Sequence, residues 1–415
     1  MTGALASDGL VARGSRVLVR HGLLGAYVVG LGVSITLSQL ALTALTLVWL
    51  WRLTTGAAAR RRVSLPLLGP VLAFSGASLL SALTSNDPVA SVMSSKGLLL
   101  VMALYVTVDA LSDGTEPDRF LDALVLVGAF AALVGIVQVM TCSVPPESGL
   151  ATRLYRCARA RGFFSIYMTQ AGVLTVLLLA SAPRLLPGAA GRARAAAPWL
   201  VMVLGLAATY VRGAWLGLGA GMLALIAVAR RGRWLVLAAL AALVVLALSG
   251  PEQLRQRVRS MTDPQEATIK ERLYMWRSGA AMLQERPLLG MGPGGVRREY
   301  PRFALPEAVK KRTGHVHNTP LQILIERGLV GFAAWLWIWV AFYLRVGALL
   351  RGLGPDRPGA RALAAGSLAA VTGFLVAGIS EYNFGDAEVI LVAWTVMALP
   401  FAAARRGEAA GAGPG

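Results

Sequence analysis

The stretch "GLVGFAAWLWIWVAFYL", Gly328–Leu344, contains no charged residue. An apolar run of this kind predicts a membrane-spanning helix, because about 20 apolar residues are needed to cross the hydrocarbon core of a bilayer. A second such run is "WLVLAALAALVVLALSG", Trp234–Gly250, and similar runs recur along the chain. We therefore expect an all-α integral membrane protein.

The composition supports this expectation. Of the 415 residues, 56% are hydrophobic and 15% are charged, whereas soluble domains carry about 25% charged residues. The first apolar run begins near Leu23 and is followed by further runs instead of a small-residue cleavage site, so no cleavable signal is predicted. The net charge of +19 is typical of basic cytoplasmic loops and does not indicate a nucleic-acid partner.

The apolar runs predict about twelve transmembrane helices, near residues 22–34, 36–51, 64–83, 93–111, 120–141, 163–182, 197–211, 213–229, 234–249, 319–344, 362–380 and 388–404. If these spans alternate in direction, most clusters of arginine fall on one side of the membrane. Lys and Arg accumulate in cytoplasmic loops, so both chain ends are predicted to be cytoplasmic. The first apolar block, residues 22–51, is short for two spans, and a single span is the alternative.

This topology predicts three parts for a multi-pass protein of the bacterial inner (cytoplasmic) membrane. Residues 1–249 would hold helices one to nine with a periplasmic loop at 142–162, residues 250–318 would form a large periplasmic cap, and residues 319–415 would hold the last three helices and a cytoplasmic tail. Within the cap, "TIKERLYMWRSGAAMLQERP" predicts an amphipathic helix that ends before Pro287. Its apolar residues recur at helical spacing, at Ile269, Leu273, Trp276, Ala280 and Leu283.

The only two cysteines, Cys142 and Cys157, lie in the same predicted periplasmic loop. Cysteines in an exported loop meet an oxidising environment, so the pair predicts a disulfide. Two unpaired thiols are the alternative.

Three arginines predict a binding site for a diphosphate. Arg212 lies between two apolar runs on the outer side, where a charge is costly unless it is paired or solvated, and it is therefore a functional candidate. Its alternative role is snorkelling to lipid headgroups. Arg161 and Arg272 lie in the outer loops, where each could also be an ordinary solvated residue. Because the guanidinium fork matches phosphate oxygens in pairs, the three would suit a lipid-linked diphosphate.

The stretch "KKRTGHVHNTPLQILIERGLVGF", Lys310–Phe332, holds two of the three histidines, His315 and His317. An imidazole that neighbouring cations keep neutral can act as a general base. Asn318 or Thr319 is the expected N-cap of the following helix, and a histidine that only caps or hydrogen-bonds is the alternative role. Cys or acidic partners for zinc are lacking around the histidine pair, so neither a metal nor another cofactor is predicted.

The remaining candidate patterns predict little chemistry. The glycines of "GMGPGG", Gly290–Gly295, do not connect a strand to a helix, which argues against a nucleotide site. Glu381, Asp386 and Glu388 share the last outer turn, where we expect them to be solvated. Glu326 is expected to pair inside the helix bundle, with Arg327 as its candidate partner.

The motifs together resemble a known superfamily. "ERLYMWRSGAAMLQERPLLGMGPGG" followed by "HVHNTPLQILIERGLVGF" is similar to the Wzy_C superfamily, which holds O-antigen ligases, O-antigen polymerases and bacterial protein O-oligosaccharyltransferases. "RGFFSIYMTQAG" and "VRGAWLGLGAG" resemble the upstream arginine motifs of the family. The similarity covers Arg161 to Phe332, and it implies a GT-C-like fold and an inverting, metal-independent glycosyltransferase.

The resemblance also implies roles for individual residues. His317 would deprotonate the acceptor hydroxyl, with His315 assisting or sharing that role, and which of the two is the base stays open. Arg161, Arg212 and Arg272 would bind the leaving diphosphate and stabilise its charge. The residues expected to support this site are Arg159, Asn318 and Gln322.

Within the superfamily the sequence favours an O-antigen ligase. The donor would be a glycan on undecaprenyl diphosphate, the acceptor a hydroxyl of the lipid A-core oligosaccharide, and the active site would face the periplasm among membrane lipids. One long cap that carries "HVHN" favours the ligase over a polymerase or a protein transferase, which remain alternatives. A flippase for lipids or oligosaccharides is an alternative of another class. Such a carrier would be expected to have charges within the spans and an internal repeat, and this sequence indicates neither.

Overall fold

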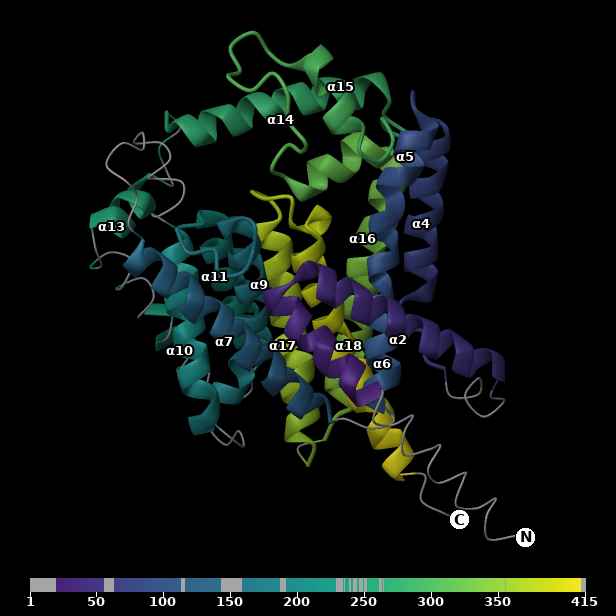
Figure 1. Ribbon diagram of the computed structural model, residues 1–415, viewed down its shortest axis with the longest axis vertical. Helices are drawn as coiled ribbons and strands as arrows, with labels where there is room; N and C mark the ends of the chain where they lie inside the picture. Colours follow the sequence, from purple (N-terminus) through teal and green to yellow (C-terminus); the bar gives the residue numbers. More distant parts are fainter. Residues whose placement is uncertain are drawn as a thin grey trace.

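A computed structural model shows a helical bundle with a smaller helical layer over one end (Figure 1). The structure describes residues 20–55, 63–112, 116–142, 159–186, 192–228, 252–260, 265–354 and 356–411, together with residue 263 and several positions between 234 and 249. Within these residues there are helices and no strands. The expectation of an all-α protein is therefore confirmed.

A helix over residues 20–33 precedes α2. The other described helices are α2 (Ile35–Thr55), α4 (Leu68–Leu83), α5 (Pro88–Ser94), η1 (Ser95–Val101), α6 (Met102–Ser112), α7 (Pro117–Thr141), α9 (Tyr167–Ser181), η2 (Ala182–Leu185), α10 (Arg192–Thr209), α11 (Arg212–Val228), α13 (Glu252–Arg259), α14 (Ala267–Glu285), α15 (Gly295–Phe303), α16 (Thr319–Gly352), α17 (Pro358–Ala377), η3 (Asn383–Gly385) and α18 (Ala387–Gly411).

Among the described residues, 7 helical segments are long and apolar enough to cross a bilayer, which makes the chain a multi-pass membrane protein. They are α2, the continuous segment Pro88–Ser112, α7, α9 with η2, α16, α17 and α18, and α4, α10 and α11 are shorter apolar helices. The twelve spans and the GT-C-like arrangement stay predictions. Much of the expected span at 234–249 lies outside the described residues.

The first apolar block forms two helices with a break at Ser34. Gly30 permits the sharp change of direction, because a Cβ atom there would lie only 2.4 Å from the backbone nitrogen of Ser38. Of the two, α2 is long and apolar enough to cross a bilayer. The block therefore contains two helical segments instead of one.

Small residues bring the inner helices into close contact. A Cβ atom at Gly217 of α11 would lie 2.5 Å from the carbonyl oxygen of Gly373 in α17, and one at Gly221 would lie 2.6 Å from that of Ala369. Such backbone approach is typical of packed helices in membranes, where lipid offers no hydrophobic driving force. Further along the core, the rings of Trp339 and Trp394 stack with centroids 6.0 Å apart.

Helix α16 is interrupted at Gly328, whose backbone has a left-handed φ of 63°. The segment after Pro287 fills the interruption: Pro287 and Leu288 accept hydrogen bonds from Leu329 and Val330, at 2.9 and 3.2 Å. A Cβ atom at Gly328 would lie 2.2 Å from the oxygen of Leu288, and one at Gly290 would meet the backbone of α16. The glycines of "LLGMG" and "ERGLVG" therefore allow the cap to dock into the helix backbone.

The cap consists of α13, α14 and α15, and α14 crosses over one end of the bundle (Figure 1). It has a small apolar core, formed by Met275, Met282, Met291, Val296, Tyr300, Val316 and Ile325. The expected helix before Pro287 is confirmed as α14. Its buried residues are Met275, Ser278, Gly279 and Met282, and the lack of a side chain at Gly279 lets Ile325 approach closely.

Cys142 directly follows α7 and is disulfide-bonded. The other cysteine of the predicted bridge, Cys157, lies outside the described residues.

Candidate functional site

The site begins where the chain leaves the cap and enters α16. Asn318 is the N-cap of this helix, and its Oδ1 atom accepts a hydrogen bond from the Leu321 amide at 2.8 Å. Its Nδ2 atom donates to the Ile379 carbonyl at 2.9 Å. The hydroxyl of Thr319 donates to the carbonyl of Glu381 at 2.9 Å. The start of α16 is therefore fastened to the turn between α17 and α18.

Gln322 fastens the histidine segment from the helix side. Its Oε1 atom accepts a hydrogen bond from the Val316 amide at 2.9 Å, and its Nε2 atom donates to Glu326 at 2.9 Å. Glu326 also pairs with Arg327 at 3.0 Å, so the expected pairing inside the bundle is present. The Val316 carbonyl accepts from the Trp276 indole at 2.9 Å. The residue between the two histidines is thus held on both sides.

His315 and His317 lie together, with ring centroids 4.2 Å apart. His317 adopts a left-handed φ of 50°, which few non-glycine residues adopt and which often marks functional sites. The Nδ1 atom of His317 is 3.3 Å from Oε2 of Glu381. The other oxygen of Glu381 accepts a hydrogen bond from Arg272 at 2.6 Å. Glu381 therefore joins a histidine to one of the candidate arginines.

The expectation that Glu381 is solvated is wrong. Its side chain is only 14% exposed and is enclosed by Arg272 and His317. Burial alone would raise the pKa of Glu381, but the hydrogen bonds and charges of these two partners hold it below its usual value. Its neighbour Asp386 accepts a hydrogen bond from Thr169 at 2.5 Å. The sequence did not indicate that this turn would fold back onto the histidines.

Arg212 begins α11, and its side chain is 11% exposed. Its guanidinium donates to Ser260, at 2.8 Å to the carbonyl, to Glu266 at 3.1 Å and to Thr268 at 2.9 Å. Burial opposes ionisation of Glu266, yet its bonds to Thr268, Arg212 and the Ile269 amide lower its pKa to about 2. Arg212 therefore points into the protein and contacts a fully ionised carboxylate.

A small cavity of about 100 Å³ connects these groups. It is lined by Arg159, Tyr167, Met168, Tyr210, Val211, Arg212, Gly213, Thr268, Arg272 and Glu381. The guanidinium of Arg159 lies 4.4 Å from the ring centre of Tyr167. Arg161 is exposed and does not line the cavity. The structure thus brings together Arg212, Arg272 and Arg159, with Arg161 outside the group.

The described residues contain no group of three or more His, Cys, Asp or Glu side chains that could hold a metal ion. The chemistry available in the cavity is that of three guanidinium groups, the carboxylate of Glu381 and, across Glu381, two imidazoles. Such a set can bind an anion with several oxygens and transfer a proton beside it. Among the groups that the sequence missed, Glu381 and Glu266 had no motif of their own to indicate them.

The fold and the site define a multi-pass helical membrane protein with an arginine-lined cavity beside a histidine pair. Residues 197–336 of this chain match the model of the Wzy_C family, described as O-antigen ligase. The match includes Arg212, Arg272, His315 and His317, and it confirms the resemblance seen in the sequence. Members of the family are glycosyltransferase-like enzymes of glycan assembly. The comparison with curated proteins finds no match.

The pKa of His315 should make the stability of the fold depend on pH. Burial and the nearby charge of His317 lower the pKa of His315 to about 4, and Lys310 and Arg272 add to this effect while Glu381 opposes it. In the unfolded chain the pKa is near 6.5, so the folded state favours the neutral ring. This contribution, about 3 kcal/mol, is present above pH 6.5 and is lost as the pH falls towards 4.

A comparison of thermal unfolding between pH 7 and pH 4 tests this expectation. Wild-type protein should lose more stability across this range than the His315→Gln variant, whose side chain does not titrate. Parallel curves for the two proteins would show that His315 titrates normally.

Proposed function

We propose that this protein is an O-antigen ligase. It transfers a glycan from undecaprenyl diphosphate to a hydroxyl of the lipid A-core oligosaccharide, with inversion and without a metal. The reaction takes place at the periplasmic face of the bacterial inner membrane. The observation that carries the proposal is the bridge through Glu381, which joins His317 to Arg272 and hence to the arginine-lined cavity.

His317 is the general base in this proposal. An ionised carboxylate can only accept hydrogen bonds, so Glu381 requires a proton on Nδ1 of His317. The Nε2 atom is then unprotonated and can take the proton of an acceptor hydroxyl. His315 has no carboxylate within hydrogen-bond distance, and its Nδ1 atom is buried without a partner in the described residues. It supports the His317 ring and stays neutral near pH 7.

Arg212 and Arg272 bind the diphosphate of the donor, together with Arg159. Glu266 and Glu381 each form an ion pair with one of these guanidinium groups. The diphosphate would replace part of these contacts and widen the cavity. Such an exchange is possible because carboxylate and diphosphate oxygens accept hydrogen bonds from the same N–H groups.

In the transfer step one proton moves to the base, one bond forms at the anomeric carbon and one bond to that carbon breaks. The acceptor hydroxyl gives its proton to Nε2 of His317, and its oxygen forms a bond with the anomeric carbon of the donor sugar. The bond between that carbon and the diphosphate oxygen breaks, and undecaprenyl diphosphate leaves with the bonding electron pair. The arginines stabilise the charge that develops on the leaving oxygen, which is the largest electrostatic demand of the reaction.

Replacing Glu381 with glutamine should lower kcat about 10- to 100-fold. The amide keeps the size of the side chain but no longer requires a proton on Nδ1 of His317. The KM for the donor should stay the same or fall, since Arg272 loses its competing carboxylate. Asp386→Asn, in the same turn, is the matched control and should retain the wild-type kcat. A rise in donor KM with an unchanged kcat would show that Glu381 does not position the base.

Transfer by the purified protein should survive removal of divalent cations. Arginine charges perform the stabilisation that a metal provides in other glycosyltransferases. The measurement is the initial rate with and without EDTA, with free Mg²⁺ or Mn²⁺ added back. Loss of activity that either ion restores would contradict the role assigned to the arginines.

The acceptor is tested by offering three candidates to the purified protein side by side. Lipid A-core, a second lipid-linked repeat unit and a Ser/Thr peptide correspond to the ligase, the polymerase and the protein transferase. We expect glycan on lipid A-core alone. In cells, loss of the gene should leave core-only lipopolysaccharide while the lipid-linked glycan accumulates. Lipopolysaccharide with a single repeat would instead identify a polymerase.

A further inference from the structure

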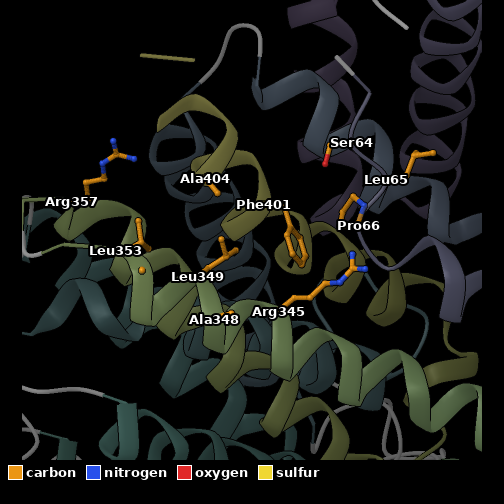
Figure 2. A pocket seen from close by; sticks show the side chains of 11 residues that line it. Ser64, Leu65, Pro66, Arg345, Ala348, Leu349, Leu353, Arg357, Phe401 and Ala404 are labelled. Atoms are coloured by element: carbon orange, nitrogen blue, oxygen red, sulfur yellow. The ribbon is translucent and has the colours of Figure 1, made fainter. Parts of the chain in front are cut away.

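A second cavity lies along the C-terminal half of α16, away from the histidines. It is an open groove of about 620 Å³, with apolar walls from α16, α18 and the segment before α4 (Figure 2). Pro66, Leu349 and Phe401 contribute to these walls, and Arg345 and Arg357 lie at two ends of the groove with Leu349 between them. The groove thus combines an apolar surface with two positive charges.

These two charges lack partners within the part of the chain that the structure describes. Arg345 and Arg357 are exposed, and neither forms an ion pair or a side-chain hydrogen bond there. The nearby Arg361 differs, because it donates to the carbonyls of Leu350 and Leu353, at 3.1 and 2.6 Å, and so completes the end of α16. The groove therefore offers two unused guanidinium groups.

The position of Arg345 along α16 indicates at which side of the membrane the groove lies. From the break at Gly328 to Arg345 the helix runs roughly 25 Å, which approaches the thickness of the hydrocarbon core, about 30 Å. Arg345 therefore lies near the headgroups of the leaflet opposite the histidine pair. Apolar walls at this depth face acyl chains, and the guanidinium groups face phosphates.

We propose that this groove binds an anionic phospholipid of that leaflet. Arg345 and Arg357 attract its headgroup, and an acyl chain lies along Leu349 and Phe401. Basic pockets between membrane helices bind anionic headgroups in this way, and each arginine adds a roughly similar increment to the affinity. The apolar walls favour a lipid over a free phosphate ion, which has no surface to bury there.

The full-length protein in detergent can be titrated with phosphatidylglycerol and with phosphatidylcholine, and the bound lipid counted by native mass spectrometry. Wild-type protein should prefer phosphatidylglycerol. Arg345→Gln and Arg357→Gln should each weaken its binding about fivefold, and the double variant about 25-fold. Arg351→Gln, an exposed arginine of α16 outside the groove, is the control and should bind like wild type.

Ala348→Phe fills the groove without removing a charge, and it should also weaken phosphatidylglycerol binding. Equal binding of the two lipids by wild-type protein, or a double variant that binds like wild type, would overturn the proposal. Displacement of the lipid by an equal concentration of inorganic phosphate would overturn it as well, since the ligand would then be the anion alone.

Discussion

Replacing His317 with alanine should lower the transfer rate about 10²- to 10⁴-fold, the range expected when a general base is removed. The acceptor hydroxyl would then have to lose its proton to water. Binding of undecaprenyl diphosphate should change little, because the arginines that hold it remain. The measurements are single-turnover transfer and donor affinity of the purified protein, with thermal unfolding as a check on the fold.

His21→Ala is the matched control, because His21 is the third histidine of the chain and is exposed at the start of the first helix. It should transfer glycan at the wild-type rate. If the His317 variant keeps its activity while His315→Ala loses it, the base is His315, and the bridge through Glu381 has another purpose.

Replacing Arg212 with glutamine should lower kcat/KM about 10²- to 10³-fold, the usual cost of removing a group that stabilises charge in the transition state. Lysine should restore little of this loss, because an ammonium group cannot bind two oxygens in the planar manner of a guanidinium. The affinity for undecaprenyl diphosphate should fall together with kcat/KM. Transfer kinetics and titration with the diphosphate measure the two quantities.

Removal of Arg212 leaves Glu266 with an uncompensated charge, and this could destabilise the protein by itself. The double variant Arg212→Gln/Glu266→Gln removes both charges and should recover stability without recovering transfer. Arg277→Gln, an exposed residue of α14, is the control and should be fully active. Recovery of transfer in the double variant would mean that Arg212 only holds the cap in place.

The same assay compares two arginines that are close in sequence. Arg159 lines the cavity and Arg161 does not, although the family motif points to Arg161. Arg159→Gln should therefore reduce donor affinity more than Arg161→Gln does. The opposite order would assign the donor site to a surface that includes the exposed Arg161.

Much of the architecture could be predicted because its cause is local. Apolar runs and capping residues lie next to each other in the chain, so the sequence indicated the helix that begins after Asn318 and the ordered helix of the cap. Arg212 was a candidate because its position between two apolar runs is itself unusual. Residues 197–336, which contain it, match the family that the motifs resembled.

The contacts inside the site could not be predicted in the same way. Glu381 meets His317 across 64 residues of sequence, through a turn that carries no motif. Arg159 and Arg161 precede a left-handed backbone turn at Gly162, where φ is 55°. On α14 the small Gly279 is buried while the larger Leu273 is 40% exposed, because close helix approach depends on both partners. Each of these outcomes depends on tertiary packing, which residue spacing alone does not report.

The proposed mechanism requires a diphosphate bound between the arginines and beside an imidazole. An experimental structure of the protein with undecaprenyl diphosphate tests this most directly. We expect phosphate oxygens within hydrogen-bond distance of Arg212 and Arg272, and Nε2 of His317 facing the position of the donor sugar. A diphosphate bound elsewhere, or a His317 ring turned away from it, would contradict the proposed mechanism.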